Sequence, residues 1–241
     1  MYAYDYSLIM TPAIKSGADL ARAHAGRFRI VGYDELRSKA TDVAGSILQK
    51  YDTTESAIVV APILMGGGLP ARLVVDALLG FGLVKAVVPC QMRRYTGVGS
   101  AGKTQMLIEM DRRRVEGEMV VGIDDLVDGG QTLAAFRKHA LLRGAAQVDT
   151  AVIFAKPHTI ERPGHCAESG VTEWLVLPGE ELDFMDELTM SDPDLQVFGE
   201  EQRAAYFGEL GFSAQVVADW LRLQRRAGQS IMNLPDHAKK K

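Results

Sequence analysis

The sequence contains four near-continuous apolar runs of strand length, and segments with helical spacing alternate with them. The runs cover residues 57–63, 84–88, 119–123 and 148–154. Segments with helical spacing are found at 33–50, 69–79 and 132–142. Strands that are apolar on both faces are typical of a parallel sheet covered by helices on each side. The alternation therefore predicts an α/β fold, with a parallel sheet flanked by helices.

The two ends of the chain are less regular than its centre. Residues 1–27 show no clear pattern, and a short strand is expected at 28–31. Beyond residue 193 the spacing predicts one helix, from about residue 213 to 226. The expected organisation is an N-terminal extension at 1–27, a central domain at 28–190 and a partly helical C-terminal extension at 191–241.

The composition argues against several classes of protein. Of the 241 residues, 47% are hydrophobic and 24% are charged, and the net charge is -4. With a pI of about 5.8, nothing points to a nucleic-acid or membrane surface. Two cysteines are too few for a disulfide framework, and no apolar run reaches the roughly 18 residues of a membrane span. We therefore expect a cytoplasmic protein with no nucleic-acid and no membrane partner.

Residues 120–133 combine groups that suit a sugar phosphate. An apolar strand ends in Asp124 and Asp125, which can accept hydrogen bonds from a sugar diol or help to hold Mg²⁺. Asp128 follows, where a base could receive or lose a proton. Backbone amides at the start of the next helix could bind the phosphate, and the candidates are Gly129, Gly130, Gln131 and Thr132. The alternative is a turn without a ligand, because Asp and Gly are common in turns.

This segment resembles the motif with which type I phosphoribosyltransferases bind 5-phosphoribosyl 1-pyrophosphate (PRPP). From about residue 28 to 179, the chain is similar to the bacterial xanthine-guanine phosphoribosyltransferase group and its archaeal relatives. The resemblance implies that Asp124 and Asp125 hold the ribose hydroxyls and that Asp128 lies near N7 of a purine. It implies that residues 129–132 bind the 5-phosphate. It also implies a small hood beside the sheet, Mg²⁺ as cofactor and a homo-oligomer.

A second glycine-rich turn follows the first apolar run. Residues 65–71 resemble the pyrophosphate loop of the same family, which implies that Met65, Gly66 and Gly67 contact PRPP. The family usually has Arg-Gly-Gly here, often with a cis peptide before the first glycine. Met65 stands where the arginine is expected, so a cation is missing from the site of the leaving group.

Two later stretches, residues 153–157 and 174–178, are similar to the base pocket of the family. The resemblance implies that Lys156 donates to the 6-oxo group of a purine, while Trp174 stacks on the base and Leu175 lies beside it. Lysine is a suitable donor for a carbonyl, and tryptophan is a flat apolar platform. The alternatives are a solvated strand end for Lys156 and core packing for Trp174.

Residues 97–104 match the P-loop pattern of nucleotide hydrolases. The context argues against that function, because the match does not directly follow a buried strand. Only about 16 residues then separate it from the acidic strand, which leaves little room for a crossover helix. We interpret the stretch as a flexible loop that closes over PRPP, in which Arg93, Arg94 and Lys103 could offset the charge of the pyrophosphate.

The function that these features predict is transfer of the 5-phosphoribosyl group from PRPP to a 6-oxopurine-like base, with release of pyrophosphate. One alternative is a regulator that senses PRPP with the same fold, and a less favoured one is a P-loop nucleotide hydrolase. The five histidines show no metal-ligand spacing, and we expect them to have surface or packing roles.

Overall fold

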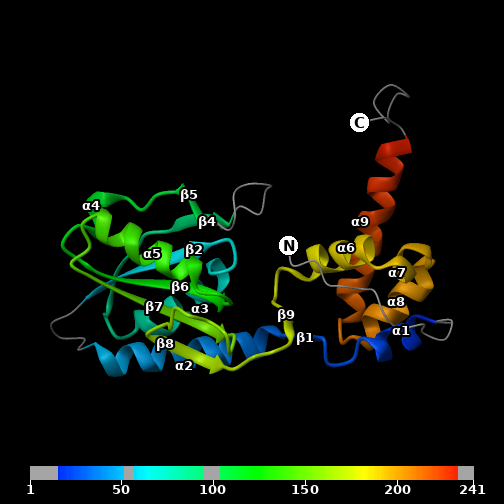
Figure 1. The fold of residues 1–241 in the computed structure, drawn as a ribbon, viewed down its shortest axis with the longest axis horizontal. Coiled ribbons are helices and arrows are strands. Elements are labelled where there is room, and N and C mark those ends of the chain that lie inside the picture. Colours follow the sequence, from blue (N-terminus) through cyan, green and yellow to red (C-terminus); the bar gives the residue numbers. More distant parts are fainter. Residues whose placement is uncertain (1–15, 52–56, 95–103, 233–241) are drawn as a thin grey trace. The chain divides into compact units, whose positions relative to one another are not determined.

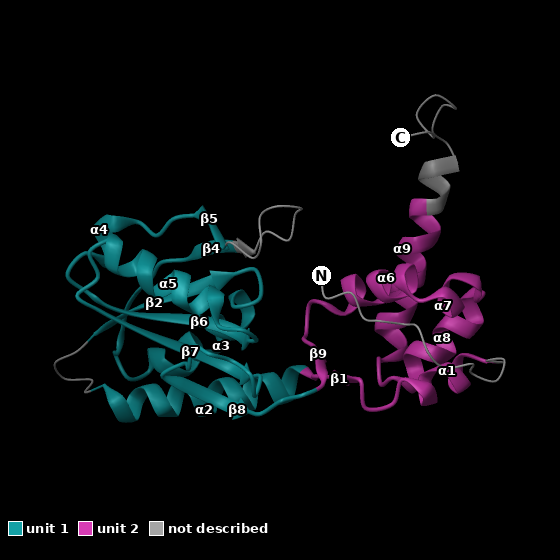
Figure 2. Ribbon diagram, viewed as in Figure 1, with its two compact units in different colours: residues 1, 33–172 teal, residues 2–32, 173–241 magenta. Residues whose placement is uncertain are grey.

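The computed structural model describes residues 16–51, 57–94 and 104–232, which form two compact units (Figures 1 and 2). The first unit is Tyr33–Thr172, and the second combines residues 2–32 with 173–241.

The first unit is built on a seven-stranded sheet. Its strands are β2 (Ile58–Leu64), β3 (Val84–Val87), β4 (Cys90–Arg94), β5 (Thr104–Ile108), β6 (Met119–Val127), β7 (Gln147–Ala155) and β8 (His165–Ser169). The order is β5-β4-β2-β6-β7-β8, and β3 also pairs with β2. Every pair is parallel except β4 with β5. The predicted fold class is therefore confirmed.

Helices cover both faces of this sheet (Figure 1). The helices of the unit are α2 (Tyr33–Lys50), α3 (Gly68–Leu79), α4 (Arg112–Val115) and α5 (Gln131–Leu142). One face of the sheet packs against α2 and α3, and the other packs against α5. On the α5 side, the ring of Phe136 occupies the space where Gly122 of β6 would carry a Cβ, at 2.2 Å. This contact fixes the position of α5 above the strand that precedes it.

The strand β6 is longer than its apolar run predicts. The run ends at Ile123, whereas β6 continues to Val127, so Asp124 and Asp125 lie within the strand and not beyond it. Pairing with β7 extends the strand, because Leu126 and Val127 lie opposite Phe154 and Ala155. Polar side chains are tolerated here because they stand at the end of the sheet.

The second unit is mainly helical. Its elements are β1 (Phe28–Ile30) and β9 (Trp174–Val176), with α1 (Gly17–Ala23), α6 (Glu181–Ser191), α7 (Pro193–Val197), α8 (Glu200–Glu209) and α9 (Ala214–Met232). The two strands pair in parallel with each other. The core is rich in aromatic side chains, which include Phe207 and Trp220, with ring centroids 5.1 Å apart. The expectation of a single helix after residue 193 was wrong, because α7 and α8 precede α9. Buried Tyr206 and Phe207 explain α8, since they pack inward from one face of that helix.

A buried polar group lies inside the second unit. His24 Nδ1 lies 2.7 Å from the hydroxyl oxygen of Tyr206, and both side chains are buried. Asp192 Oδ2 lies 3.7 Å from Nε2 of the same ring, and Asp192 also caps α7. Burial, and then the nearby charge of Arg27, lower the pKa of His24 below its usual 6.5, although Asp192 opposes this effect. The surroundings of His24 in the folded protein therefore favour the neutral ring.

We expect the free energy of unfolding to fall as the pH drops below about 6.5. An unfolded His24 gains a proton in this range, whereas the folded one resists it, so acid favours the unfolded chain. His24→Gln should reduce this slope between pH 7.5 and 5, as measured by urea unfolding at a series of pH values. If the free energy of unfolding changed with pH equally in the wild type and in His24→Gln, the lowered pKa of His24 would be contradicted.

Tyr206→Phe removes the buried hydrogen bond to His24. We expect this change to lower the free energy of unfolding by about 1–2 kcal/mol at pH 7.5, as measured by urea unfolding.

Candidate functional site

The turn between β6 and α5 presents the start of a helix at the carboxyl end of the sheet. Gly130 is the N-cap of α5, with a left-handed φ of 91°, and no side chain caps the helix. The first turn also carries no acidic residue. Backbone N–H groups at a helix start have no acceptor within the helix, and together with the helix dipole they favour an anion. The position requires glycine, because a Cβ there would lie 2.6 Å from Cβ of Glu161.

The glycine turn after β2 packs directly against the end of β6. A Cβ on Gly67 would lie 2.3 Å from the carbonyl oxygen of Ile123 and 2.6 Å from that of Ile63. A Cβ on Gly66 would lie 2.2 Å from the Asp125 carboxylate. The structure thus places the glycine turn after β2 against the acidic end of β6, which the sequence assigns to the same ligand.

The residue that departs from the family pattern is exposed. Met65 is 83% exposed, so its side chain does not fill the core. The peptide bond Leu64–Met65 is cis, one bond earlier than the family pattern suggests.

The two adjacent carboxylates of β6 differ in their surroundings. Asp124 is buried, and its Oδ1 accepts a hydrogen bond from the backbone N–H of Asp125 at 3.1 Å. Asp125 is half-buried, and its Oδ1 accepts from the backbone N–H of Leu126 at 2.6 Å. Burial raises the pKa of Asp125, although hydrogen bonds from Asp124 and from the backbone oppose it. A cation or hydroxyl donors beside this carboxylate would favour its ionised form.

Asp128 follows β6 and contacts a histidine that the sequence analysis assigned to a surface or packing role. Nε2 of His158 lies 2.6 Å from Oδ1 of Asp128. The two side chains come from loops that follow neighbouring strands, β6 and β7. The sequence held one signal for this contact. His158 comes two residues after Lys156, a candidate site residue, and so lies in the loop after a strand that neighbours β6.

The predicted base-pocket residues fall in different units. Lys156 belongs to the first unit, where its backbone N–H donates to the carbonyl of Val127 at 2.9 Å and so joins the ends of β7 and β6. Trp174 and Leu175 belong to β9 in the second unit. Trp174 is 46% exposed there, whereas Leu175 is buried.

The cationic candidates of the flexible loop are only partly covered by the structure. Arg93 and Arg94 end β4, and their side chains lie outside the described residues, as does all of Lys103. The P-loop match lies outside them too, except for Thr104. This residue begins the strand β5, whereas a P-loop threonine begins a helix. The hydrolase alternative therefore loses its structural support.

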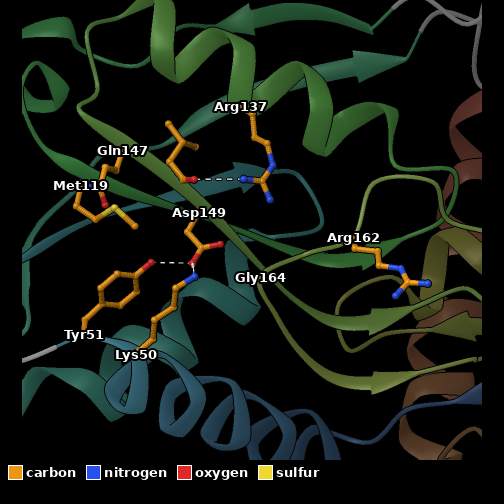
Figure 3. Close-up of a pocket in the computed structure, with 9 residues that line it drawn as sticks. Lys50, Tyr51, Met119, Arg137, Gln147, Asp149, Arg162 and Gly164 are labelled. Atoms are coloured by element: carbon orange, nitrogen blue, oxygen red, sulfur yellow. Dashed lines mark hydrogen bonds and ion pairs between the residues drawn. The ribbon is translucent and has the colours of Figure 1, made fainter.

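A separate pocket of about 380 Å³ lies at the other end of the sheet (Figure 3). Met119 and Gln147, the first residues of β6 and β7, line it, and none of the candidate site residues do. Inside it, Oδ2 of Asp149 lies 2.7 Å from both Lys50 Nζ and the Tyr51 hydroxyl oxygen. These hydrogen bonds satisfy a buried carboxylate and tie the end of α2 to β7, so the group has a structural role.

No group of three or more His, Cys, Asp or Glu side chains in the described part of the chain could hold a metal ion. None of its helices is long and apolar enough to cross a membrane.

Together these features define an α/β protein whose candidate ligand site lies at the carboxyl ends of parallel strands. A family model, described as the phosphoribosyl transferase domain, matches residues 32–178. The chain belongs to this phosphoribosyltransferase family. It is therefore an enzyme, and it transfers a phosphoribosyl group from PRPP to a base.

Solved structures are similar in fold. The purine phosphoribosyltransferase of Pyrococcus horikoshii matches with a TM-score of 0.53 and 19% identity, over 64% of this chain and 93% of that one. The hypoxanthine phosphoribosyltransferase of Trypanosoma cruzi matches with a TM-score of 0.50 and 21% identity, over 56% of this chain and 74% of that one. Comparison with curated protein sequences gave no significant match.

The close contact between the glycine turn after β2 and the end of β6 can be tested with Gly67→Ala. The new methyl group would meet the backbone carbonyls of Ile123 on β6 and of Ile63 on β2, which cannot rotate away, so the turn must move away from β6. We expect a loss of about 1–3 kcal/mol in the free energy of unfolding, and weaker PRPP binding by calorimetry. Gly68→Ala is the matched control, because its methyl group would meet only the end of the Leu64 side chain, at 3.4 Å. Equal stability of the two variants would refute the contact.

Proposed function

We propose that this enzyme transfers the 5-phosphoribosyl group of PRPP to a 6-oxopurine-like base and releases pyrophosphate. The observation that carries the proposal is the packing of the glycine turn after β2 against the acidic end of β6, the strand that leads into the uncapped start of α5. The names of the two similar structures, a purine and a hypoxanthine transferase, favour a purine as the acceptor.

Each part of PRPP has a suitable partner in this arrangement. The amides of residues 129–132 would bind the 5-phosphate, and Thr132 would add a hydroxyl. Asp124 and Asp125 would accept hydrogen bonds from the ribose hydroxyls. The turn formed by Met65, Gly66 and Gly67 would let backbone amides approach the pyrophosphate, because glycine has no side chain in the way.

The leaving group needs positive charge that Met65 does not supply. Pyrophosphate develops negative charge as its bond to C1 of the ribose breaks, and cations stabilise that charge. We propose that Arg93, Arg94 and Lys103 supply this positive charge.

The acidic residues of β6 fit a magnesium ion that enters with the substrate. Carboxylate oxygens are suitable ligands, and Mg²⁺ usually keeps waters and substrate phosphates, so two protein carboxylates suffice. Asp124 and Asp125 would hold it, directly or through the ribose hydroxyls. Bound there, the ion would neutralise part of the charge of PRPP.

Asp128 is the proposed acid–base residue. In the forward reaction the base nitrogen bonds to C1 of the ribose, while pyrophosphate leaves with the electrons of the broken C–O bond. Asp128 would take the proton that the base loses. No covalent nucleophile is required. Burial raises the pKa of Cys90, on β4, to about 12, so its thiol stays protonated.

Lys156, in the first unit, would recognise the base, because its ammonium group can donate to the 6-oxo oxygen. The roles of Trp174 and Leu175, in the second unit, stay predictions of the family resemblance. We also propose, from the family resemblance alone, that the enzyme is cytoplasmic and forms a homo-oligomer.

The acceptor can be identified by incubating the protein with PRPP and Mg²⁺ and with single bases, and assaying pyrophosphate. We expect release with hypoxanthine, guanine or xanthine, and little with adenine, which lacks the 6-oxo group. Release with adenine alone would refute the proposed specificity. PRPP binding without release for any base would favour a PRPP sensor, which the absence of a cation at Met65 would explain.

Asp128→Asn tests the acid–base role. An amide cannot take the proton, so kcat should fall about 100-fold or more, whereas the dissociation constant for PRPP should stay within about twofold. Asp42→Asn, an exposed change on α2, is the charge-matched control. If PRPP binding and turnover fell together in Asp128→Asn, the residue would be a binding group and not an acid–base group.

A further inference from the structure

The strongest unassigned feature is the contact between His158 and Asp128. The distance of 2.6 Å between Nε2 and Oδ1 is typical of a short, charge-assisted hydrogen bond. His158 is part of neither glycine turn nor the acidic strand. It nevertheless touches the one carboxylate to which we assign a proton transfer.

We propose that His158 is a positioning residue for Asp128. Its Nε2–H donates to Oδ1, which fixes the orientation of the carboxylate and leaves Oδ2 to face the base. The inference rests on the proposed function, because the orientation of Asp128 affects turnover only if Asp128 exchanges a proton with the base.

The loop that carries His158 is held in place at several points. Before the histidine, the N–H of Lys156 donates to the carbonyl of Val127 at 2.9 Å. After it, the N–H of Thr159 donates back to the carbonyl of Lys156 at 3.3 Å, which closes a turn around His158. Further on, Oε1 of Glu161 lies 2.7 Å from Nε of Arg137 on α5. The surrounding chain therefore sets the place of the imidazole beside Asp128.

Stability of the fold does not explain the contact. The side chain of His158 is 62% exposed and that of Asp128 is 40% exposed, and exposed pairs contribute little to folding. A base bound beside Asp128 would exclude water from the pair, and the hydrogen bond would gain strength in the drier site. Loss of His158 should therefore reduce turnover and leave unfolding almost unchanged.

The test compares steady-state kinetics of four variants with the base that the wild type prefers. His158→Ala should lower kcat about tenfold, which is less than the whole contribution of acid–base catalysis. Its affinity for PRPP should stay within about twofold of the wild-type value. His158→Gln should keep most of the activity, because its side-chain amide can donate to the same oxygen. In an Asp128→Asn background, His158→Ala should cause no further loss, because the two residues act as a unit. Ile160→Ala, at an 82% exposed position of the same loop, is the control and should match the wild type.

Three kinetic results would overturn the inference: equal losses in His158→Gln and His158→Ala, a parallel loss of PRPP affinity, or an undiminished loss in the Asp128→Asn background. The ring nitrogens of His158 give a readout that needs no activity. Their ¹⁵N NMR signals should show the proton on Nε2, and Asp128→Asn should shift that signal.

The two readouts separate this inference from the proposed function. A wild type that is inactive with every base refutes the transfer reaction and the catalytic part of this inference, even when the NMR signals show the pair. An active wild type whose His158 signals are unchanged by Asp128→Asn overturns the pair alone.

Discussion

The parallel pairing of β2 with β6 is the constraint on which the rest of the structure depends. Its register, from Ile58 opposite Met119 to Pro62 opposite Ile123, brings both strands to the same edge of the sheet. The turn after β2 then lies so close to β6 that Gly67 has no room for a side chain. Side chains alternate between the two faces of a sheet along a strand. A shift of β6 by one residue would therefore move Asp124 and Asp125 each to the other face of the sheet. The candidate site is thus a consequence of register as much as of residue type.

Much of this arrangement could be predicted from the sequence. Buried parallel strands need apolar side chains on both faces, so β2 and β7 stand out as continuous apolar runs, and α5 shows helical spacing. The glycines after β2 and the acids at the end of β6 were chosen as candidates because ligand sites of such sheets lie at the carboxyl ends of strands. The prediction of a parallel sheet flanked by helices followed from these local signals and is confirmed.

The remainder depends on contacts between distant segments. No local pattern extends β6 past Ile123, since the extension comes from pairing with β7. The contact of His158 with Asp128 joins residues 30 positions apart and has no motif. The helix α8 was missed because glutamates and small residues dilute its apolar face, and only its packing in the second unit shows which side is buried. Side-chain partners of this kind become visible only when strand order is known.

The close packing of α1 on α8 has a consequence for the order in which the chain folds. A Cβ on Gly17 would lie 2.1 Å from the carbonyl oxygen of Gln202, so the two helices meet at their backbones. During synthesis, α1 leaves the ribosome early, but its partner follows only after the whole of Tyr33–Thr172 has been made. The sheet can therefore form first, as N-terminal domains generally do. Until α8 has been made, the apolar face of α1 lacks the helix against which it packs. The mainly helical unit can assemble only after residues 33–172 have been synthesised.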